Sequence, residues 1–498
     1  MRLVRSPSVN PPGARLSLQG EGDKPMTRRA IIQIGTEKTG TTSLQAFLAA
    51  NRSRLVEKGF VYPRFCGEVN QTGLAAFAMS PMRMDAIRAQ WGIHAPSDVR
   101  PMRERMRAAA KAELDGTRTA IFCNEHCHSR LTSPDEVETL RRFLAPHFDE
   151  IRISIYLRRQ DQVAVSLYST RLKSGGTECD ILPRTNGEDP YFNYDRSLRL
   201  WEDAFGRENV TVRLFDRKRL SGGSVVQDFL ETWEIGAPEE FIATGNQNES
   251  VNPAAQEFLR HLNGHVTPIE GLPLDAVLGP LSASLAEHFP GSGAKPARAA
   301  AEAFYAMFRA SNEAVRVRHF PDLASLFPED FTSYPETCGE AAATLEDFAA
   351  IAAALQVENT RHIRRLEAEI CIRDARLAWD KGETAPAMAA LGRAVSWLPH
   401  HAPTHRIRGE YLLRSGCAAE AAEAARAATA HAPENFEYWH FLGVVLRSLG
   451  DLEGARDAQA HAVDLNPAHE PSRTCLEQIE QALAVQPEAP PASVARSA

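Results

Sequence analysis

A run of Gly, Lys and Thr near the N-terminus could bind a phosphate-like group. It reads Gly35-Thr36-Glu37-Lys38-Thr39-Gly40-Thr41-Thr42 and lies between an expected strand at 30–34 and an expected helix at 43–58. A strand-to-helix turn offers free backbone N–H groups and the positive end of a helix dipole to an anion. The Lys adds a charge and the Thr hydroxyls add donors. The sequence therefore predicts a phosphate or phosphosulfate site made by residues of one short segment: Gly35, Lys38, Thr39, Gly40, Thr41, Thr42 and Ser43.

The order of residues in this loop differs from that of a Walker A loop. There the Lys directly follows the second Gly of GxxxxGK[ST], whereas here Lys38 comes two residues before Gly40. This order argues against an ordinary ATPase or GTPase. Taken alone, the loop is also compatible with a polar helix-capping turn that binds no ligand.

Two patterns together resemble the sulfotransferases that use 3′-phosphoadenosine 5′-phosphosulfate (PAPS). The segment 38–42, Lys-Thr-Gly-Thr-Thr, is similar to the 5′-phosphosulfate loop of that family. Arg158 at a strand end, with Ser166 eight residues later on the next expected helix, is similar to its second signature. The resemblance implies that this pair binds the 3′-phosphate, with Arg159 in place of Arg158 if the turn is one residue shorter. A guanidinium that forks onto phosphate oxygens suits that role.

The same resemblance implies a general base after the strand expected at 119–123, where Asn124, Glu125 and His126 follow. Glu125 is the first choice because an acidic residue there is similar to the bacterial pattern. His126 is the second, since histidine in general titrates near neutral pH. Without such a role, Glu125 would pair with Arg130, and His126 would pack in the core or face solvent.

The transfer implied by the resemblance needs positioning and charge stabilisation more than covalent help. A sulfuryl group passes in line from the donor to an acceptor, much as in phosphoryl transfer. Lys38 is the expected electrostatic partner of the leaving oxygen, and no metal is expected. The implied acceptor is a hydroxyl on a carbohydrate, a lipid-linked glycan or a small molecule.

The resemblance covers about residues 28–335 and is closer to the bacterial branch of the family. Ser43 stands where the animal cytosolic enzymes carry an aromatic residue that stacks on adenine. A late Arg-Lys-Gly segment, which clamps the 3′-phosphate in those enzymes, is missing from this sequence. The adenine contacts are therefore unassigned.

The elements that must hold these residues follow from the apolar pattern. Short apolar segments at 30–34, 119–123, 151–157 and 209–215 alternate with helical patterns, including one over 162–173. Such alternation is typical of an α/β domain with a mostly parallel sheet. We expect a P-loop-type domain over 29–335, preceded by a disordered tail, 1–28, in which Met26 is an alternative first residue.

The C-terminal third repeats every 34 residues. Gly382, Gly416 and Gly450 share this spacing, as do three further series: Pro399, Pro433 and Pro467; Ala387, Ala421 and Ala455; Ala394, Ala428 and Ala462. The period and the small residues at helix crossings indicate tetratricopeptide (TPR) repeats. We expect a helical linker over 336–367, then three repeats over 368–469 with a capping helix to 485, and a disordered tail over 486–498. The repeats would form an all-α solenoid whose groove suits a protein partner.

Composition excludes several classes of protein. The net charge of −8 gives no basic excess for nucleic acid or an anionic membrane. No apolar run reaches the ~18 residues of a membrane span, and the N-terminus lacks a signal-like apolar segment, so a bacterial cytoplasmic location is expected. The eight cysteines are scattered and are expected to be reduced. Cys123 and Cys127 have no second pair at zinc-ligand spacing, but His126 and His128 lie beside them, so metal binding stays a minor alternative.

Two other functions compete with sulfuryl transfer. A P-loop small-molecule kinase would need a Walker-type Lys and a magnesium-holding Asp after a strand, a combination that the sequence does not show. A TPR scaffold with an inactive catalytic domain would make the repeats the working part. The intact loop and the Arg158–Ser166 pair argue against that scaffold.

Overall fold

The chain forms two compact units. The computed structural model describes residues 27–244, 250–266, 274–337 and 343–485. Its units span 1–351 and 352–498. The expected tails lie outside the described residues, apart from residues 27 and 28, and so does the 338–342 part of the expected linker.

The N-terminal unit is built on a five-stranded sheet in the order β2-β3-β1-β4-β5. Its strands are β1 Arg29–Gln33, β2 Phe60–Val61, β3 Thr119–Cys123, β4 Glu150–Leu157 and β5 Val210–Leu214. All pairings are parallel, so the prediction of an α/β domain with a parallel sheet is confirmed. The two-residue β2 was not predicted, because it is too short to carry a periodic signal.

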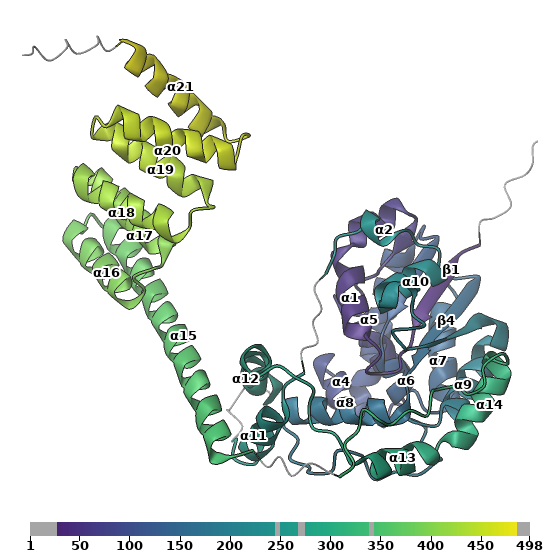
Figure 1. Ribbon diagram of the computed structural model, residues 1–498. Coiled ribbons are helices and arrows are strands. Elements are labelled where there is room, and N and C mark those ends of the chain that lie inside the picture. The colour runs from purple at the N-terminus through teal and green to yellow at the C-terminus, as the bar shows by residue number, and fades with distance from the viewer. Residues whose placement is uncertain (1–26, 245–249, 267–273, 338–342, 486–498) are drawn as a thin grey trace, which may run out of the picture. The chain divides into compact units, whose positions relative to one another are not determined.

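Helices cover both faces of this sheet (Figure 1). Ile31 and Ile32 of β1 point to opposite faces and are both fully buried, as in a sheet covered on both sides. Ile31 belongs to the core that packs α1 Thr41–Ala50, α2 Arg52–Glu57 and α10 Val225–Thr232. Ile32 belongs to the core on the other face, with α5 Pro96–Leu114, α7 Pro134–Leu144 and α9 Tyr194–Phe205.

The remaining elements of this unit connect or flank the sheet. The short helices among them are α3 Gly73–Ala78, α4 Ala86–Gln90 and α6 His126–Arg130, with 3-10 turns at Arg207–Asn209, Ser221–Gly223 and Pro238–Glu240. The longer ones are α8 Gln160–Lys173, α11 Pro253–Asn263, α12 Leu274–His288, α13 Arg298–Ala306 and α14 Arg309–His319.

The helix expected over 43–58 is divided at Asn51 into α1 and α2. The Asn51 amide nitrogen donates to the carbonyl oxygens of Phe47 and Ile242, and its oxygen accepts from the Ile242 N–H. A side chain that binds a distant segment in this way competes with the helical hydrogen bonds. The division therefore depends on a tertiary contact that the local pattern does not contain.

The C-terminal unit is a series of helical hairpins. Its last repeats are the pairs α17 Ala402–Arg414 with α18 Ala418–His431, and α19 Phe436–Ser448 with α20 Leu452–Leu465. Each helix of the second pair begins 34 residues after its counterpart. The alanines of the two repeating Ala series are fully buried, and the three repeating glycines have φ between 78° and 82°, as expected where a helix ends. The prediction of TPR-like helical repeats is confirmed.

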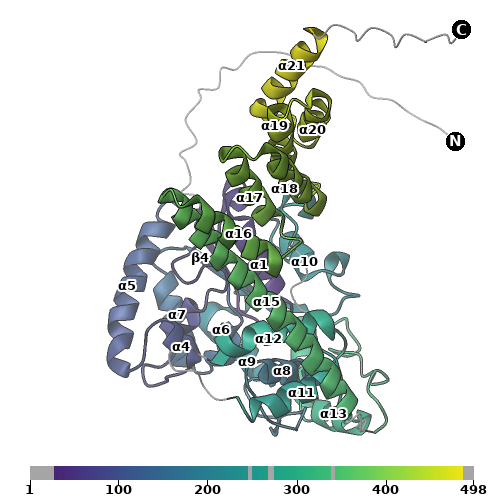
Figure 2. The ribbon, with the colours of Figure 1, turned by 90° about the vertical axis from the view of Figure 1, so that its left-hand side faces the viewer.

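The first repeat has no separate leading helix. The helix α15, Leu345–Asp380, runs without interruption through the expected linker into that repeat and is followed by α16 Thr384–Trp397. At the other end, α21 Glu470–Val485 buries Cys475 and Ile479 against the last hairpin. The stacking of successive helices from α16 to α21 can be followed in Figure 2. Among the described helices, none has both the length and the apolar character that a membrane span requires.

Candidate functional site

The candidate residues meet at the carboxyl edge of the three central strands. The loop 35–42 follows β1, Glu125 and His126 follow β3, and Arg158 follows β4. Because β1 lies between β3 and β4, these segments are neighbours in space. Ligands of open α/β sheets bind outside the carboxyl ends of such strands. The fold thus brings together residues that are more than 100 positions apart in the sequence.

The loop 35–42 is attached to the end of β4 by backbone hydrogen bonds. Thr36 N–H donates to the Tyr156 carbonyl over 2.9 Å, and Tyr156 N–H donates to the Gly35 carbonyl over 2.8 Å. The buried hydroxyl of Thr39 donates to the Thr36 carbonyl over 2.6 Å. Gly40 is the N-cap of α1, with φ 78°. The loop is therefore held so that it leads into the N-terminus of α1.

The first turn of α1 presents hydroxyls of differing exposure. Thr41 is buried, Thr42 is exposed and Ser43 is half-buried. The first N–H groups of a helix have no acceptor within that helix, so they carry a partial positive charge. This turn offers the hydrogen-bond donors that the sequence predicted for an anion.

Lys38 is a half-buried cation that contacts a hydroxyl. Its Nζ donates to Thr170 Oγ1 of α8 over 2.5 Å. Burial lowers the pKa of Lys38, against the opposing effect of the Glu37 and Glu125 carboxylates. Its backbone has φ 66°, which is uncommon for a residue other than glycine. Such backbone strain is frequent at functional sites.

Arg158 lies beside this loop, and burial lowers its pKa too. Its guanidinium donates to the Lys38 carbonyl over 2.9 Å and to the Gln162 side chain over 3.3 Å. Its charged carbon lies 5.6 Å from the centre of the Phe215 ring. Ser166, its predicted companion, is a half-buried residue of α8, and its carbonyl accepts from the Thr170 hydroxyl.

Arg159, the alternative to Arg158, is bound to the protein itself. Its guanidinium forms a two-point ion pair with Asp161, with N···O distances of 2.8 and 2.9 Å. It also donates to the carbonyls of Pro328 and Asp330 and stacks on the Phe331 ring at 4.2 Å. With these partners, Arg159 has a structural role, and Arg158 is the arginine directed toward the loop.

Glu125 is half-buried and accepts a hydrogen bond on each carboxylate oxygen. Gln45 of α1 donates over 2.5 Å and Asn70 donates over 3.2 Å. Arg130, the partner expected if Glu125 had no catalytic role, lies instead 3.2 Å from Asp85 and 4.0 Å from Glu37. The carboxylate is therefore held by two neutral amides next to the loop.

His126 is the first residue of α6, and its side chain contacts the loop 35–42. Its Nδ1 lies 3.2 Å from Glu37 Oε1, and the two side chains are 24% and 15% exposed. The other oxygen of Glu37 accepts from the Tyr191 hydroxyl over 3.0 Å. Burial raises the pKa of Glu37, but the hydrogen bonds from His126 and Ser129 and the charge of Arg130 lower it overall to about 2. Glu37 is thus an ionised carboxylate inside the loop.

Several neighbours of this site were not predicted. Glu37 lies within the loop and is its only acidic residue, a signal that could have identified it. Tyr191, Gln45 and Asn70 reach the site from separate segments and give no local pattern. Their roles follow only from the fold.

The cysteines near the site are buried free thiols. Burial, the largest cause, raises the pKa of both Cys123 and Cys127, and the Glu125 carboxylate adds to it. Such thiols are unreactive. Within the described residues, no group of three or more His, Cys, Asp or Glu side chains is arranged to hold a metal ion.

A cavity of about 640 Å³ is lined by residues of α9 and of the segments before it and after α13. Its wall includes His128, which is 2% exposed. In the part of the chain that the structure describes, neither ring nitrogen of His128 has a hydrogen-bond partner. The His128 ring lies 5.4 Å from that of Tyr191, whose hydroxyl binds Glu37. Asn193, Ser197 and Ser311 are also in the wall.

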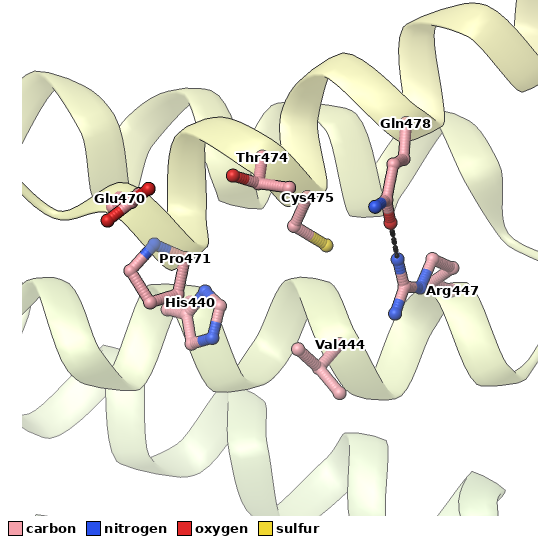
Figure 3. A pocket seen from close by; sticks show the side chains of 8 residues that line it. All are labelled: His440, Val444, Arg447, Glu470, Pro471, Thr474, Cys475 and Gln478. Carbon is pink, nitrogen blue, oxygen red and sulfur yellow. Dashed lines mark hydrogen bonds between the residues drawn. The ribbon is translucent and has the colours of Figure 1, made fainter.

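A second hollow, of about 440 Å³, lies in the repeat unit between α19 and α21. Figure 3 shows the side chains that line it, with Arg447 of α19 donating to Gln478 of α21 over 3.0 Å. His440, Glu470 and Thr474 add further polar groups. The hollow is small and open to solvent, and both polar and apolar side chains line it.

Comparison with known proteins gives no family assignment. No protein-family model matches the chain. An uncharacterized protein of Archaeoglobus fulgidus is 31% identical over 132 residues, which cover 26% of this chain and 34% of that protein. The chain therefore spans about a third of the length of this curated relative.

Similar solved structures include several TPR domains. They include the first TPR of Spaghetti (RPAP3) bound to an HSP90 peptide, at 19% identity over 24% of this chain and 95% of that one. The Sgt2 TPR domain from Aspergillus fumigatus is 24% identical over 26% and 90%, and the Arabidopsis OM64 TPR domain is 16% identical over 24% and 98%. Each has a TM-score of 0.23, so the assignment of the repeat rests on the 34-residue hairpins themselves.

Proposed function

We propose that this protein is a sulfotransferase that moves a sulfuryl group from PAPS to an acceptor hydroxyl. The observation that carries the proposal is the pair Lys38 and Arg158. The Arg158 guanidinium contacts the Lys38 main chain. Burial lowers the pKa of both side chains, and the charge of Arg158 lowers that of Lys38 further. Neither belongs to an ion pair between the described residues, and their hydrogen-bond partners are neutral groups. An anion is the ligand that would neutralise them.

The donor groups fit a molecule with two anionic ends. The loop 35–42 and the first turn of α1, with Thr41, Thr42 and Ser43, would hold the 5′-phosphosulfate. Arg158 and Ser166 would hold the 3′-phosphate, since a guanidinium and a hydroxyl match phosphate oxygens. When bound, PAPS supplies an activated sulfuryl group. The adenine contacts are not part of the proposal.

The residues of the chain would supply positioning, charge and a base. Lys38 would stabilise negative charge on the leaving oxygen, because its ammonium is held in a partly buried site where such charges interact strongly. Glu125 or His126 would accept the proton of the acceptor hydroxyl. Both follow β3, next to the loop that follows β1, so the base and the donor site share one edge of the sheet.

The cavity that His128 lines is a candidate site for part of the acceptor. A neutral imidazole offers one donor and one acceptor, which is the pattern that a hydroxyl satisfies. Both ring nitrogens of His128 are buried and have no partner among the described residues, so a hydroxyl that entered beside the ring would satisfy them. A hydroxyl on a glycan or small molecule is consistent with this wall.

Calorimetric binding of 3′-phosphoadenosine 5′-phosphate (PAP) to the full-length protein tests the proposal. We expect binding that weakens at least tenfold in Lys38→Ala and Arg158→Ala. Arg100→Ala on α5 is the matched control, because it removes an equal charge from a side chain that is 89% exposed. An acceptor screen with PAPS would then follow. No binding by a folded wild-type protein would overturn the proposal, and magnesium-dependent ATP turnover would favour a kinase.

We further propose that the repeat unit binds a protein partner or part of a large acceptor. The hollow between α19 and α21 offers Arg447, Glu470 and Gln478 to a polar ligand. Cross-linking from this hollow, compared with cross-linking from the far side of α20, would test whether a partner binds there. Equal labelling from both positions would argue against a specific site.

A further inference from the structure

Glu37 connects the loop 35–42, which would hold the sulfuryl donor, to His126, one of the two candidate bases. It immediately precedes Lys38 in the loop, and its Oε1 lies 3.2 Å from Nδ1 of His126, the first residue of α6. Its Oε2 accepts from Tyr191 over 3.0 Å. Ser129 and Arg130 also face the carboxylate. One side chain thus receives several donors from α6 and from the segment before α9.

The state of Glu37 determines which nitrogen of His126 carries hydrogen. A carboxylate with a pKa of about 2 is ionised at neutral pH, so it can only accept hydrogen bonds. The Nδ1 of His126 must then be the donor. In a neutral imidazole, hydrogen on Nδ1 leaves a lone pair on Nε2. A hydrogen-bonded carboxylate fixes histidine tautomers in this way in the Ser-His-Asp triad.

We infer that Glu37 is a positioning residue, which holds His126 in the Nδ1–H tautomer so that Nε2 is the general base for the acceptor hydroxyl. This inference rests on the proposed function and decides between its two candidate bases. The acceptor O–H bond breaks and its proton forms an N–H bond at Nε2. The electron pair left on the acceptor oxygen forms the new O–S bond, while the bridging S–O bond of PAPS breaks and its electrons leave with PAP.

The surroundings of Glu125 suit a different task. Both of its oxygens already accept amide hydrogens, from Gln45 and Asn70. An incoming hydroxyl would have to share these oxygens with the amides, whereas Nε2 of His126 is not engaged by Glu37. Glu125 therefore fits the binding wall of the site better than the proton-accepting position.

The tautomer of His126 can be measured without any acceptor. In the full-length protein with ¹³C,¹⁵N-labelled histidine, the resonance of His126 is the one that disappears in His126→Ala. We expect the Nδ1–H signature in the wild type at pH 7.5 and its loss in Glu37→Gln. Glu125→Gln is the matched control, since the same substitution one residue from His126 should leave the signature in place. An Nε2–H signature in the wild type would overturn the inference.

Rates provide the second measurement, with ³⁵S-labelled PAPS and either an acceptor from the screen or water. We expect Glu37→Gln to lower the transfer rate roughly 10- to 100-fold with PAP affinity within about threefold of wild type. In a His126→Ala background the same change should have less than about a twofold effect, because residues that act as a unit are not additive. Equal fold-losses in both backgrounds would show that Glu37 only supports the loop. If the wild type failed to bind PAP, the proposed function would fail instead, whatever the tautomer.

Discussion

The guanidinium of Arg158 donates a hydrogen bond to the main-chain carbonyl of Lys38 over 2.9 Å. This bond joins the two segments that carry the resemblance to sulfotransferases, which are 120 residues apart in the sequence. It orients the guanidinium along the loop while leaving other N–H groups for a ligand, because an Arg has five donors. The next residue, Arg159, is turned to the opposite side and bound within the fold.

Alanine substitution should separate the roles of these adjacent arginines. Arg158→Ala should weaken PAP binding at least tenfold and cost about 1 kcal/mol of stability, since it removes few internal hydrogen bonds. Arg159→Ala should destabilise the N-terminal unit by about 3–5 kcal/mol, because it leaves the fully buried Asp161 carboxylate without its charged partner and with only the neutral Tyr334 hydroxyl donating to it. Calorimetric titration and chemical unfolding would check the pair. Equal effects of the two changes on both quantities would contradict this assignment.

Gly40 should tolerate no side chain without a change in the loop. A Cβ there would lie 2.8 Å from Val225 Cγ1 and 3.3 Å from the Phe215 ring, and φ is +78°. Gly40→Ala should therefore weaken PAP binding at least tenfold, since the loop must move away from α10. Adding Val225→Ala should restore part of the affinity by removing the contact, although the backbone strain remains. If Gly40→Ala alone bound PAP with wild-type affinity by calorimetry, the geometry of the loop would not be required for binding.

His128 should make the N-terminal unit less stable in mild acid. Burial lowers its pKa from 6.5 to about 4, against the opposing charges of Glu37 and Asp189. Between these values the unfolded chain binds a proton that the folded chain does not, so stability is full above pH 6.5 and falls as the pH drops toward 4. The loss is at most roughly 3 kcal/mol. His128→Phe keeps a ring against Tyr191 but cannot titrate.

Urea unfolding at pH 4.5, 5.5 and 7.5, followed by Trp fluorescence, would measure this effect. The free energy of unfolding of the wild type should decline more steeply toward acid than that of His128→Phe. Parallel declines would mean that His128 is protonated equally in the folded and unfolded chains.

Contiguous features of the site could be predicted from the sequence, whereas its tertiary partners could not. The loop 35–42 is recognisable because its donors share one short segment between a strand and a helix. Arg158 and Arg159 could not be distinguished, because neighbours at a strand end point in opposite directions and only packing against Asp161 decides between them. The contact of Glu37 with His126 spans 89 residues and depends on β1 and β3 being adjacent.

The fold shows the same division between local and tertiary signals. The buried strands β1, β3, β4 and β5 were predicted by their apolar runs, and the hairpins by their 34-residue period. Neither signal contains the Asn51 contact with Ile242 that separates α1 from α2. Nor does the period reveal that α15 continues without a break from the linker into the first repeat, because both segments are favourable helix formers.

Gly409 of the repeat unit should be required for close packing, unlike Gly392. A Cβ on Gly409 would lie 2.8 Å from the Phe441 ring and 3.3 Å from the Ala421 carbonyl, where α17 meets α18 and α19. Gly409→Ala should destabilise the repeat unit by about 1–3 kcal/mol through overpacking, despite the higher helix propensity of Ala. Gly392→Ala in α16 is the control, since no atom lies within 4 Å of its Cβ position and up to about 1 kcal/mol of stabilisation is expected. Hydrogen exchange of α17–α20 amides in the full-length protein would measure both variants, and equal protection in the two would contradict the packing argument.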